Sequence, residues 1–180
     1  FTRTISTVPE IYTEEELTAL KKEHWIHELG DVSNINVDYT KLLGCGFDAK
    51  REELRGYLRE YEKQGDERAV HVLQTQISIL DTVQNLADRY RQLALEQGNR
   101  VVAESLAQVP AKPPRSFLEA LQMFRIIHFT MWCGRNYHNT VGRFDQYMLP
   151  YLKADLEKGI YDLDSALELL EEFFLTFNRD

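Results

Sequence analysis

Apolar residues recur at three- and four-residue steps through most of the chain, which is the pattern of amphipathic helices. The longest run predicts a helix from Glu67 to Gln97 with one buried stripe. That stripe consists of Leu73, Ile77, Leu80, Val83, Ala87, Tyr90 and Ala94. Shorter helices are predicted over 13–29, 48–64, 100–108, 116–133, 144–158 and 164–178. The fold class is therefore predicted to be mainly α.

Start and stop signals bound these helices. Thr13 with Glu16 and Ser116 with Glu119 have the spacing of a capping box. Asp162 or Asp164 is expected to cap the last helix, and Pro150 is a point where the preceding helix can break. Helix ends are predicted at the glycines numbered 30, 65, 98 and 159. Short strands are expected around 30–37 and 134–142, and a short helix over 38–43.

Three of the five prolines lie in the segment 109–115, which cannot be helix interior. This segment is interpreted as a rigid joint between a helical layer over 13–108 and a helix-loop-helix over 116–180. Both sides carry large apolar faces that need covering. Residues 1–180 are therefore treated as one partial domain.

The last predicted helix stays apolar to its end, with Phe173, Phe174 and Phe177 on it. An exposed face of this kind would favour aggregation. We therefore expect the remainder of a larger protein, or a partner chain, to cover these three side chains.

Composition narrows the class of protein. The 180 residues are 43% hydrophobic and 28% charged, with a formal net charge of −8. An acidic chain is a poor nucleic-acid binder, and no apolar run approaches the ~18 residues of a membrane span. Cys45 and Cys133 do not form a disulfide framework, which favours a reduced, cytoplasmic location.

Several side chains are candidates for metal binding or catalysis. His24 and His27 share a helix face with Asp31 one turn on, but a zinc site needs a further ligand, so surface histidines are favoured and no metal is predicted. His128 lies in an apolar helix and is interpreted as a core residue. Cys45 and Cys133 lack a basic neighbour or a favourable helix end, and are interpreted as structural.

The segment GRNYHNTVGRFDQY is the richest in polar groups. A Gly-framed loop entered from a buried helix is a typical position for a binding site. We favour His138 and Asn139 as site residues. For Arg143 and Asp145 the favoured interpretation is a pair that only fastens the loop.

Residues 113–178, with PPRSFLEALQMFRIIHF, NYHNTVGRFDQYMLPYLKADLEKG and ALELLEEFFLTFN, resemble the pyruvate formate-lyase-like glycyl radical enzymes. Their pattern here is a Thr-Phe-x-Glu-Ala-Leu-Gln helix, then Asn-Gly-His-Ser, then Gly-Arg-x-Asp-Gln-Tyr. The segment EHWIHELGDVSNINVDYTKLLGCGFDAKREEL is similar to the family's Asp-Tyr-x-x-x-Leu-x-x-Gly region.

The resemblance implies that the chain is the helical N-terminal portion of a ten-stranded β/α-barrel enzyme. It implies a parent that is a radical lyase, dehydratase or decarboxylase, or is formate acetyltransferase-like, in anaerobic metabolism on a small organic substrate. A glycyl radical, installed by an iron–sulfur activating enzyme using S-adenosylmethionine, oxidises a barrel cysteine to a thiyl. A homodimer is an open expectation.

The match at the pocket is partial. His138 matches the family's His, whereas Asn139 stands where the family has Ser, and Asn34 falls where an earlier segment has His. Each change replaces hydrogen-bonding groups, so the substrate is expected to differ from that of members carrying His and Ser. These three residues are the predicted substrate-binding set.

No residue of this chain is assigned a catalytic role. No Cys-x-Glu occurs, because Cys45 and Cys133 are followed by other residues, and the Arg-Val-x-Gly-Tyr radical motif does not occur. The resemblance therefore implies that the 180 residues alone are inactive. The alternative is a non-catalytic helical scaffold or interaction module from a split or degenerate gene.

Overall fold

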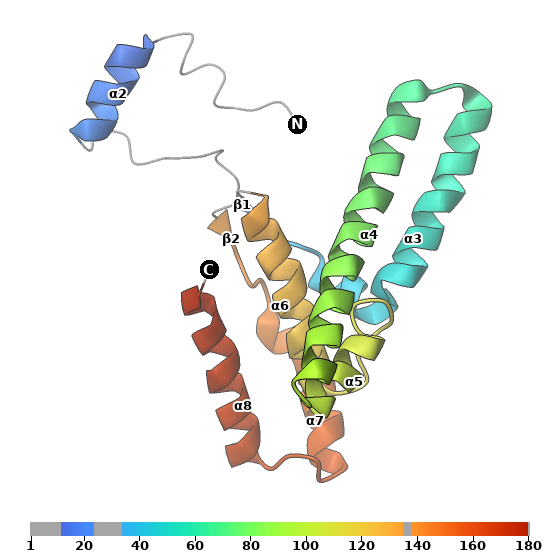
Figure 1. Cartoon of the computed structure of the whole chain (residues 1–180), viewed down its shortest axis with the longest axis vertical. Helices are drawn as coiled ribbons and strands as arrows, with labels where there is room; N and C mark the ends of the chain where they lie inside the picture. The colour runs from blue at the N-terminus through green and yellow to red at the C-terminus, as the bar shows by residue number, and fades with distance from the viewer. Residues whose placement is uncertain (1–11, 24–33, 135–137, 180) are drawn as a thin grey trace. The chain divides into compact units, whose positions relative to one another are not determined.

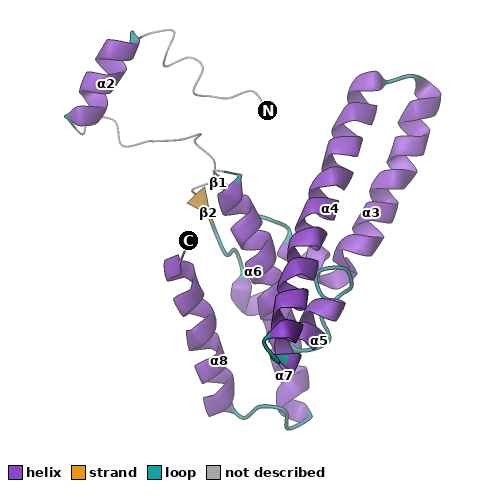
Figure 2. Cartoon of the chain, in the orientation of Figure 1, coloured by secondary structure: helices purple, strands orange, loops and turns teal. Residues whose placement is uncertain are grey.

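The structure, a computed structural model, describes residues 12–23, 34–134 and 138–179. Helices dominate these residues, as predicted, and two short strands, β1 and β2, accompany them (Figures 1 and 2). The elements in chain order are α2 (Glu14–Lys22), β1 (Asn34–Ile35), α3 (Tyr39–Gln64), α4 (Glu67–Glu96), α5 (Arg100–Gln108), α6 (Phe117–Cys133), β2 (His138–Asn139), α7 (Phe144–Glu157), α8 (Leu163–Leu175) and the 3₁₀ turn η2 (Thr176–Arg179). None of the helices in the described ranges is long and apolar enough to cross a bilayer.

The chain divides into two compact units. One, which we call the strand unit, comprises residues 1–37 and 130–142 and contains the pair β1 and β2. The other, the helical unit, comprises residues 38–129 and 143–180. The prediction of a single partial domain over 1–180 stays a prediction.

The first predicted helix begins as expected. The Thr13 side chain accepts from the Glu16 N–H, and the Glu16 carboxylate accepts from the Thr13 N–H at 2.8 Å. These two bonds satisfy donors that the first helical turn leaves open. α2 ends at Lys22 with Glu23 as its C-cap, so the prediction that this helix continues to about Leu29 was wrong; residues 24–33 lie outside the described residues.

α3 begins nine residues earlier than the predicted start at Asp48. Asp38 caps it by accepting from the Lys41 N–H at 3.0 Å, which places the predicted short helix over 38–43 inside α3. Gly46, with φ +73°, interrupts the helix at a kink. The prediction of separate segments therefore reflected a real break, one position before Phe47.

The kink joins α3 to the proline segment. With the helix interrupted, the Phe47 and Asp48 N–H groups donate to the carbonyls of Pro110 and Ala111, each at 2.9 Å. A Cβ at Gly46 would lie 2.7–2.8 Å from backbone atoms of Ala111 and Lys112. Only a glycine permits this approach, so the predicted rigid joint is held by backbone bonds across the kink.

α3 and α4 lie side by side as an antiparallel pair, and α5 folds back on α4 (Figure 1). Arg51 links the pair by donating to Asp48 at 2.8 Å and to Asp81 of α4 at 2.7 Å. Val83, Ala87 and Ala94 of the predicted stripe are buried. Tyr90 is 55% exposed, so the prediction that it belongs to the buried stripe was wrong.

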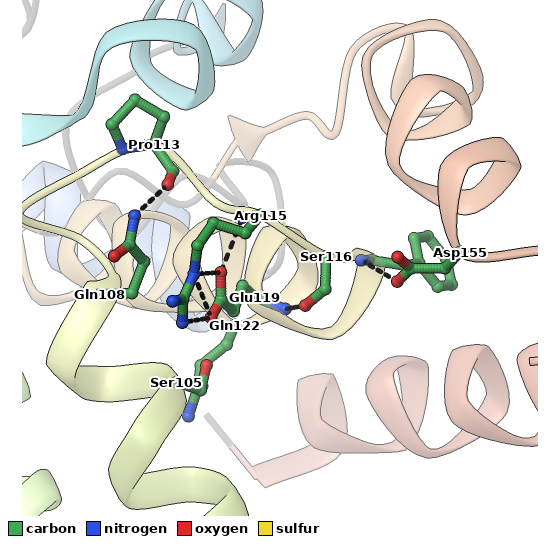
Figure 3. Close-up of polar contacts among 9 residues, drawn as sticks. Ser105, Gln108, Pro113, Arg115, Ser116, Glu119, Gln122 and Asp155 are labelled. Carbon is green, nitrogen blue, oxygen red and sulfur yellow. Dashed lines mark hydrogen bonds and ion pairs between the residues drawn. The ribbon is translucent and has the colours of Figure 1, made fainter. Parts of the chain in front are cut away.

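α6 is the central helix, as its nearly uniform apolarity predicted. Phe124 and Met123 are fully buried, and Glu119 is only 6% exposed. The predicted capping box is half formed: the Ser116 hydroxyl accepts from the Glu119 N–H at 3.2 Å. The Glu119 carboxylate instead accepts from the backbone N–H of Arg115 at 2.7 Å (Figure 3).

An aromatic core surrounds Phe124 in the helical unit. Its ring lies 4.3 Å from Tyr39 and 5.6 Å from both Phe144 and Phe173, centroid to centroid. Ring pairs at such distances add to the gain from burying their area. The core therefore gathers α3, α6, α7 and α8 around one residue.

The last helix is only partly covered. Phe173 is 6% exposed and packs in the aromatic core, whereas Phe174 is 46% exposed and Phe177 is half-buried. The expected exposed face therefore holds for part of the set. The Asp162 carboxylate caps α8 by accepting from the Ser165 N–H at 2.8 Å, and α7 continues through Pro150 without the allowed break.

Candidate functional site

The three predicted site residues are brought together by the parallel pairing of β1 and β2. In this register Asn34 is opposite His138, and Ile35 is opposite Asn139. Paired residues of neighbouring strands lie about 5 Å apart across the ladder. Segments distant in the sequence thus place Asn34, His138 and Asn139 at one short sheet within the strand unit.

Asn139 carries the chemical signal of this site. Both the oxygen and the nitrogen of its side-chain amide are buried, and neither has a hydrogen-bond partner in the described part of the chain. Leaving a buried polar group unpaired costs roughly 1–3 kcal/mol. An amide that offers two donors and an acceptor, with none used, is suited to hold a polar partner that the chain itself does not supply.

Gly142 and Asn36, which follow β2 and β1 in the chain, approach each other closely within the strand unit. Gly142 has φ +60°, and a Cβ there would lie 2.5 Å from the Asn36 side-chain nitrogen. The Asn36 side chain therefore occupies the space that any other residue at 142 would fill. Sequence analysis missed Asn36; its position two residues after Asn34, in a run predicted as strand, was the available signal.

Arg143 and Asp145 form an ion pair at the start of α7. The guanidinium donates to both carboxylate oxygens, at 3.0 Å and 2.8 Å, and both side chains are exposed. The bond from Arg143 is the main reason that the pKa of Asp145 lies below its ordinary range. Sequence reasoning favoured a pair that only fastens the loop, and that interpretation stays a prediction.

His128 lies in the core, as its interpretation expects, whereas Cys133 is exposed. His128 is 3% exposed, stacks on Phe124 at 5.6 Å and lies 4.8 Å from the Phe177 ring. The Cys45 Sγ is 3.4 Å from the Gly46 carbonyl oxygen, and neither Cys45 nor Cys133 forms a disulfide. Over residues 12–23, 34–134 and 138–179, no three metal-ligating side chains gather. His24, His27 and Asp31 lie outside the described residues.

Comparison with solved structures shows which proteins share this fold. A hydroxyproline dehydratase from Clostridioides difficile, solved with trans-4-hydroxy-L-proline bound, is 25% identical and aligns with a TM-score of 0.75 over 96% of this chain. A glycyl radical enzyme from Archaeoglobus fulgidus, also 25% identical, aligns with a TM-score of 0.73 over 87% of this chain. The chain covers 24% and 23% of those two proteins.

Sequence comparison defines the family. Residues 3–179 match the pyruvate formate lyase-like family. The trans-4-hydroxy-L-proline dehydratase of Clostridioides difficile is 32% identical over 131 residues, which are 68% of this chain. An isethionate sulfite-lyase of Oleidesulfovibrio alaskensis is 29% identical over 82% of this chain. The chain belongs to the pyruvate formate-lyase-like family of glycyl radical enzymes.

The chain is much shorter than the relatives that it matches. The chain spans 16% of the length of that dehydratase and 18% of the sulfite-lyase. Activity, substrate and partners of whole family members therefore pass to this chain only as a proposal.

Proposed function

We propose that this chain is the N-terminal portion of a glycyl radical lyase, dehydratase or decarboxylase, and that the β1–β2 edge forms part of the wall of its substrate pocket. The observation that carries the proposal is the buried amide of Asn139, which has no hydrogen-bond partner among the described residues. Asn34 and His138, opposite each other in the register, complete the substrate-binding set.

The substrate is a small organic molecule that bears a hydroxyl or another polar oxygen. The similar dehydratase from Clostridioides difficile is named for a hydroxylated compound, trans-4-hydroxy-L-proline. The Asn139 amide can donate to such an oxygen and accept from its proton. A site built on paired polar groups rejects analogues that leave one of them unpaired. The pair Asn34 and Asn139, in place of His and Ser, therefore selects a different compound.

The rest of the enzyme supplies the chemistry. A glycyl radical, installed by an S-adenosylmethionine iron–sulfur activase, provides the one-electron oxidation of a cysteine that starts turnover. Neither the Cys-x-Glu nor the Arg-Val-x-Gly-Tyr motif occurs among these 180 residues, so the chain by itself is inactive and holds no cofactor. Its own residues bind and orient substrate and exclude water. A cytoplasmic, anaerobic setting follows from this radical chemistry.

The exposed surface of Phe174 and the half-buried Phe177 support a covering polypeptide. The remainder of the enzyme is the first candidate, and a partner chain is the second. The competing function is a non-catalytic helical scaffold or interaction module. The partial exposure of this face is equally compatible with it, so the test must separate the two.

The test compares two preparations under strict anaerobiosis. The isolated chain with an activase and S-adenosylmethionine should give no radical signal and no hydrogen exchange. The protein as its gene encodes it should give both, and Asn139→Ala should raise KM for its substrate at least about tenfold, because a buried hydrogen bond is lost. Thr140→Ala, at an exposed neighbouring position, is the matched control. A complete gene product without Cys-x-Glu and Arg-Val-x-Gly-Tyr motifs would favour the scaffold function.

A further inference from the structure

A side-chain contact lies just beyond the short β1–β2 ladder of the strand unit. Asn36 is the first residue after β1, and Gly142 is the third residue after β2. A Cβ built at Gly142 would be 2.5 Å from the Asn36 amide nitrogen and 3.3 Å from both the carbon and the oxygen of that carboxamide. The planar end of the Asn36 side chain therefore lies against a residue that has no side chain of its own.

This contact reaches beyond the register of the two strands. β1 and β2 pair over two positions, and continuing that parallel ladder would set Asn36 opposite Thr140. The Asn36 side chain instead reaches Gly142, two positions further along. Parallel pairing is slightly less stable per residue than antiparallel pairing, and an isolated pair of strands is at best marginally stable. A two-residue ladder therefore gains from a further contact that holds its two segments together.

The Asn139 side chain depends on this backbone for its position. Its buried carboxamide has no hydrogen-bond partner among the described residues, so no such bond there fixes its orientation. Its orientation therefore follows from packing and from the path of its own backbone, which reaches Gly142 in three residues. Three residues span at most about 11 Å, so a shift of Gly142 is transmitted to Asn139 over a short distance.

The contact depends on the identity of both residues. Gly142 leaves the space open, because it lacks a Cβ and its φ of +60° suits glycine. Asn36 fills that space with the end of an exposed side chain. A larger residue at 142 would push the carboxamide aside, and a smaller residue at 36 would leave a gap over Gly142.

We propose that Asn36 is a positioning residue of the β1–β2 edge: its carboxamide, seated against Gly142, holds the segment after β2 so that the Asn139 amide keeps the orientation that binds substrate. Asn36 itself faces Gly142 and is assigned no contact with substrate. The role rests on the proposed function, in which Asn139 binds substrate. The position of the Asn139 amide, however, is measurable without any turnover.

Crystal structures of the complete protein, without activation, measure the positioning directly. Asn36→Ala empties the space over Gly142, so the Asn139 carboxamide should move by about 1 Å or more, a shift large enough to disturb a bound substrate. Asn36→Asp keeps the shape of the side chain and should leave Asn139 in place. Thr140→Ala, at an exposed position of the same segment, is the matched control. An Asn139 amide that is unmoved in Asn36→Ala would overturn the proposal.

Kinetics of the activated enzyme show whether this position matters for binding, with trans-4-hydroxy-L-proline, for which a similar dehydratase is named, as the probe. Asn36→Ala should raise KM about three- to tenfold at nearly unchanged kcat, because it weakens binding that substrate and transition state share. A merely structural defect would lower the active fraction, and with it kcat, and leave KM unchanged. In an Asn139→Ala background, Asn36→Ala should raise KM no further. A further rise in that background would overturn the proposal.

The same variants separate this proposal from the proposed function. If Asn139→Ala raises KM and Asn36→Ala does not, the positioning role is wrong and the binding role of Asn139 stands. If Asn139→Ala leaves KM unchanged, the substrate-binding set is wrong and the role of Asn36 falls with it. Thermal unfolding of each variant checks that the protein stays folded, as expected for a substitution at an exposed side chain.

Discussion

The Asp155 carboxylate of α7 accepts a hydrogen bond of 2.7 Å from the backbone N–H of Phe117, the first residue of α6 (Figure 3). Asp155 is fully buried, and the Lys158 ammonium lies 4.0 Å from its carboxylate. A carboxylate in this position satisfies an N–H that the helix start leaves open and interacts favourably with the helix dipole. Asp155 thus ties α7 to the start of the central helix.

Replacing Asp155 should therefore destabilise the helical unit. Asp155→Ala leaves the Phe117 N–H buried without its acceptor, and we expect a loss of about 1–3 kcal/mol in the free energy of unfolding. Asp155→Asn keeps an acceptor oxygen and should recover part of that loss. Urea denaturation followed by circular dichroism measures both, with the exposed Asp164→Ala as control. An Asp155→Ala chain as stable as the control would show that the bond contributes nothing.

Gly46 should tolerate substitution far less than another left-handed glycine. Gly46→Ala places a methyl group against the backbone of Ala111 and Lys112, which cannot yield as a flexible side chain does. Gly65 has nearly the same φ, +72°, but open space around it, so Gly65→Ala reports the conformational cost alone, about 1 kcal/mol. Thermal unfolding should place Gly46→Ala well below Gly65→Ala. Equal midpoints would contradict the close approach at the kink.

The chain should lose stability in alkaline solution through its buried tyrosines. Burial raises the pKa of both Tyr39 and Tyr147 above the ordinary value of a phenol. A raised folded-state pKa means that the stabilisation is fully present below the unfolded-state pKa of about 10 and is lost as pH rises above it. Tyr39→Phe should flatten this loss in an unfolding series from pH 8 to about 11. Tyr57→Phe, at an exposed position, should keep the wild-type slope; equal slopes for both variants would contradict the assignment.

Substrate preference should respond to Asn139 in the complete enzyme. Asn139→Ser restores the residue that the family pattern has after its His, and it exchanges an amide for a hydroxyl. We expect kcat/KM for the native substrate to fall about tenfold or more, because the smaller side chain loses a donor or an acceptor. A panel of hydroxylated compounds should show a relative gain for at least one other substrate. A uniform loss across the panel would assign Asn139 a structural role instead.

Helices and their caps were predictable because their causes are local. Thr13, Asp162 and the terminating Gly65 act within one turn of their own helix, and each is observed in that role. The extra turns at the start of α3 were not predicted as one helix. The break between these turns and the rest of α3, at Gly46, is held by backbone bonds to Pro110 and Ala111, which are more than sixty positions away.

The candidate site was likewise predictable where its causes are local and unpredictable where they are long-range. The polar loop identified His138 and Asn139, and the family resemblance added Asn34. The direct pairing of Asn34 with His138 is a long-range fact that no local pattern contains. The buried carboxylate of Asp155 was missed, although an acidic residue four positions after Tyr151 on a core-facing side of α7 was the available signal.

The central claim is that these residues belong to an enzyme that stores a glycyl radical. Electron paramagnetic resonance of the protein, isolated without oxygen from the cells that make it and treated with its activase and S-adenosylmethionine, tests this claim most directly. The account predicts an organic radical on a polypeptide several times larger than 21.1 kDa. A stable gene product of about that mass, with no radical under conditions that activate a known family member, would contradict it.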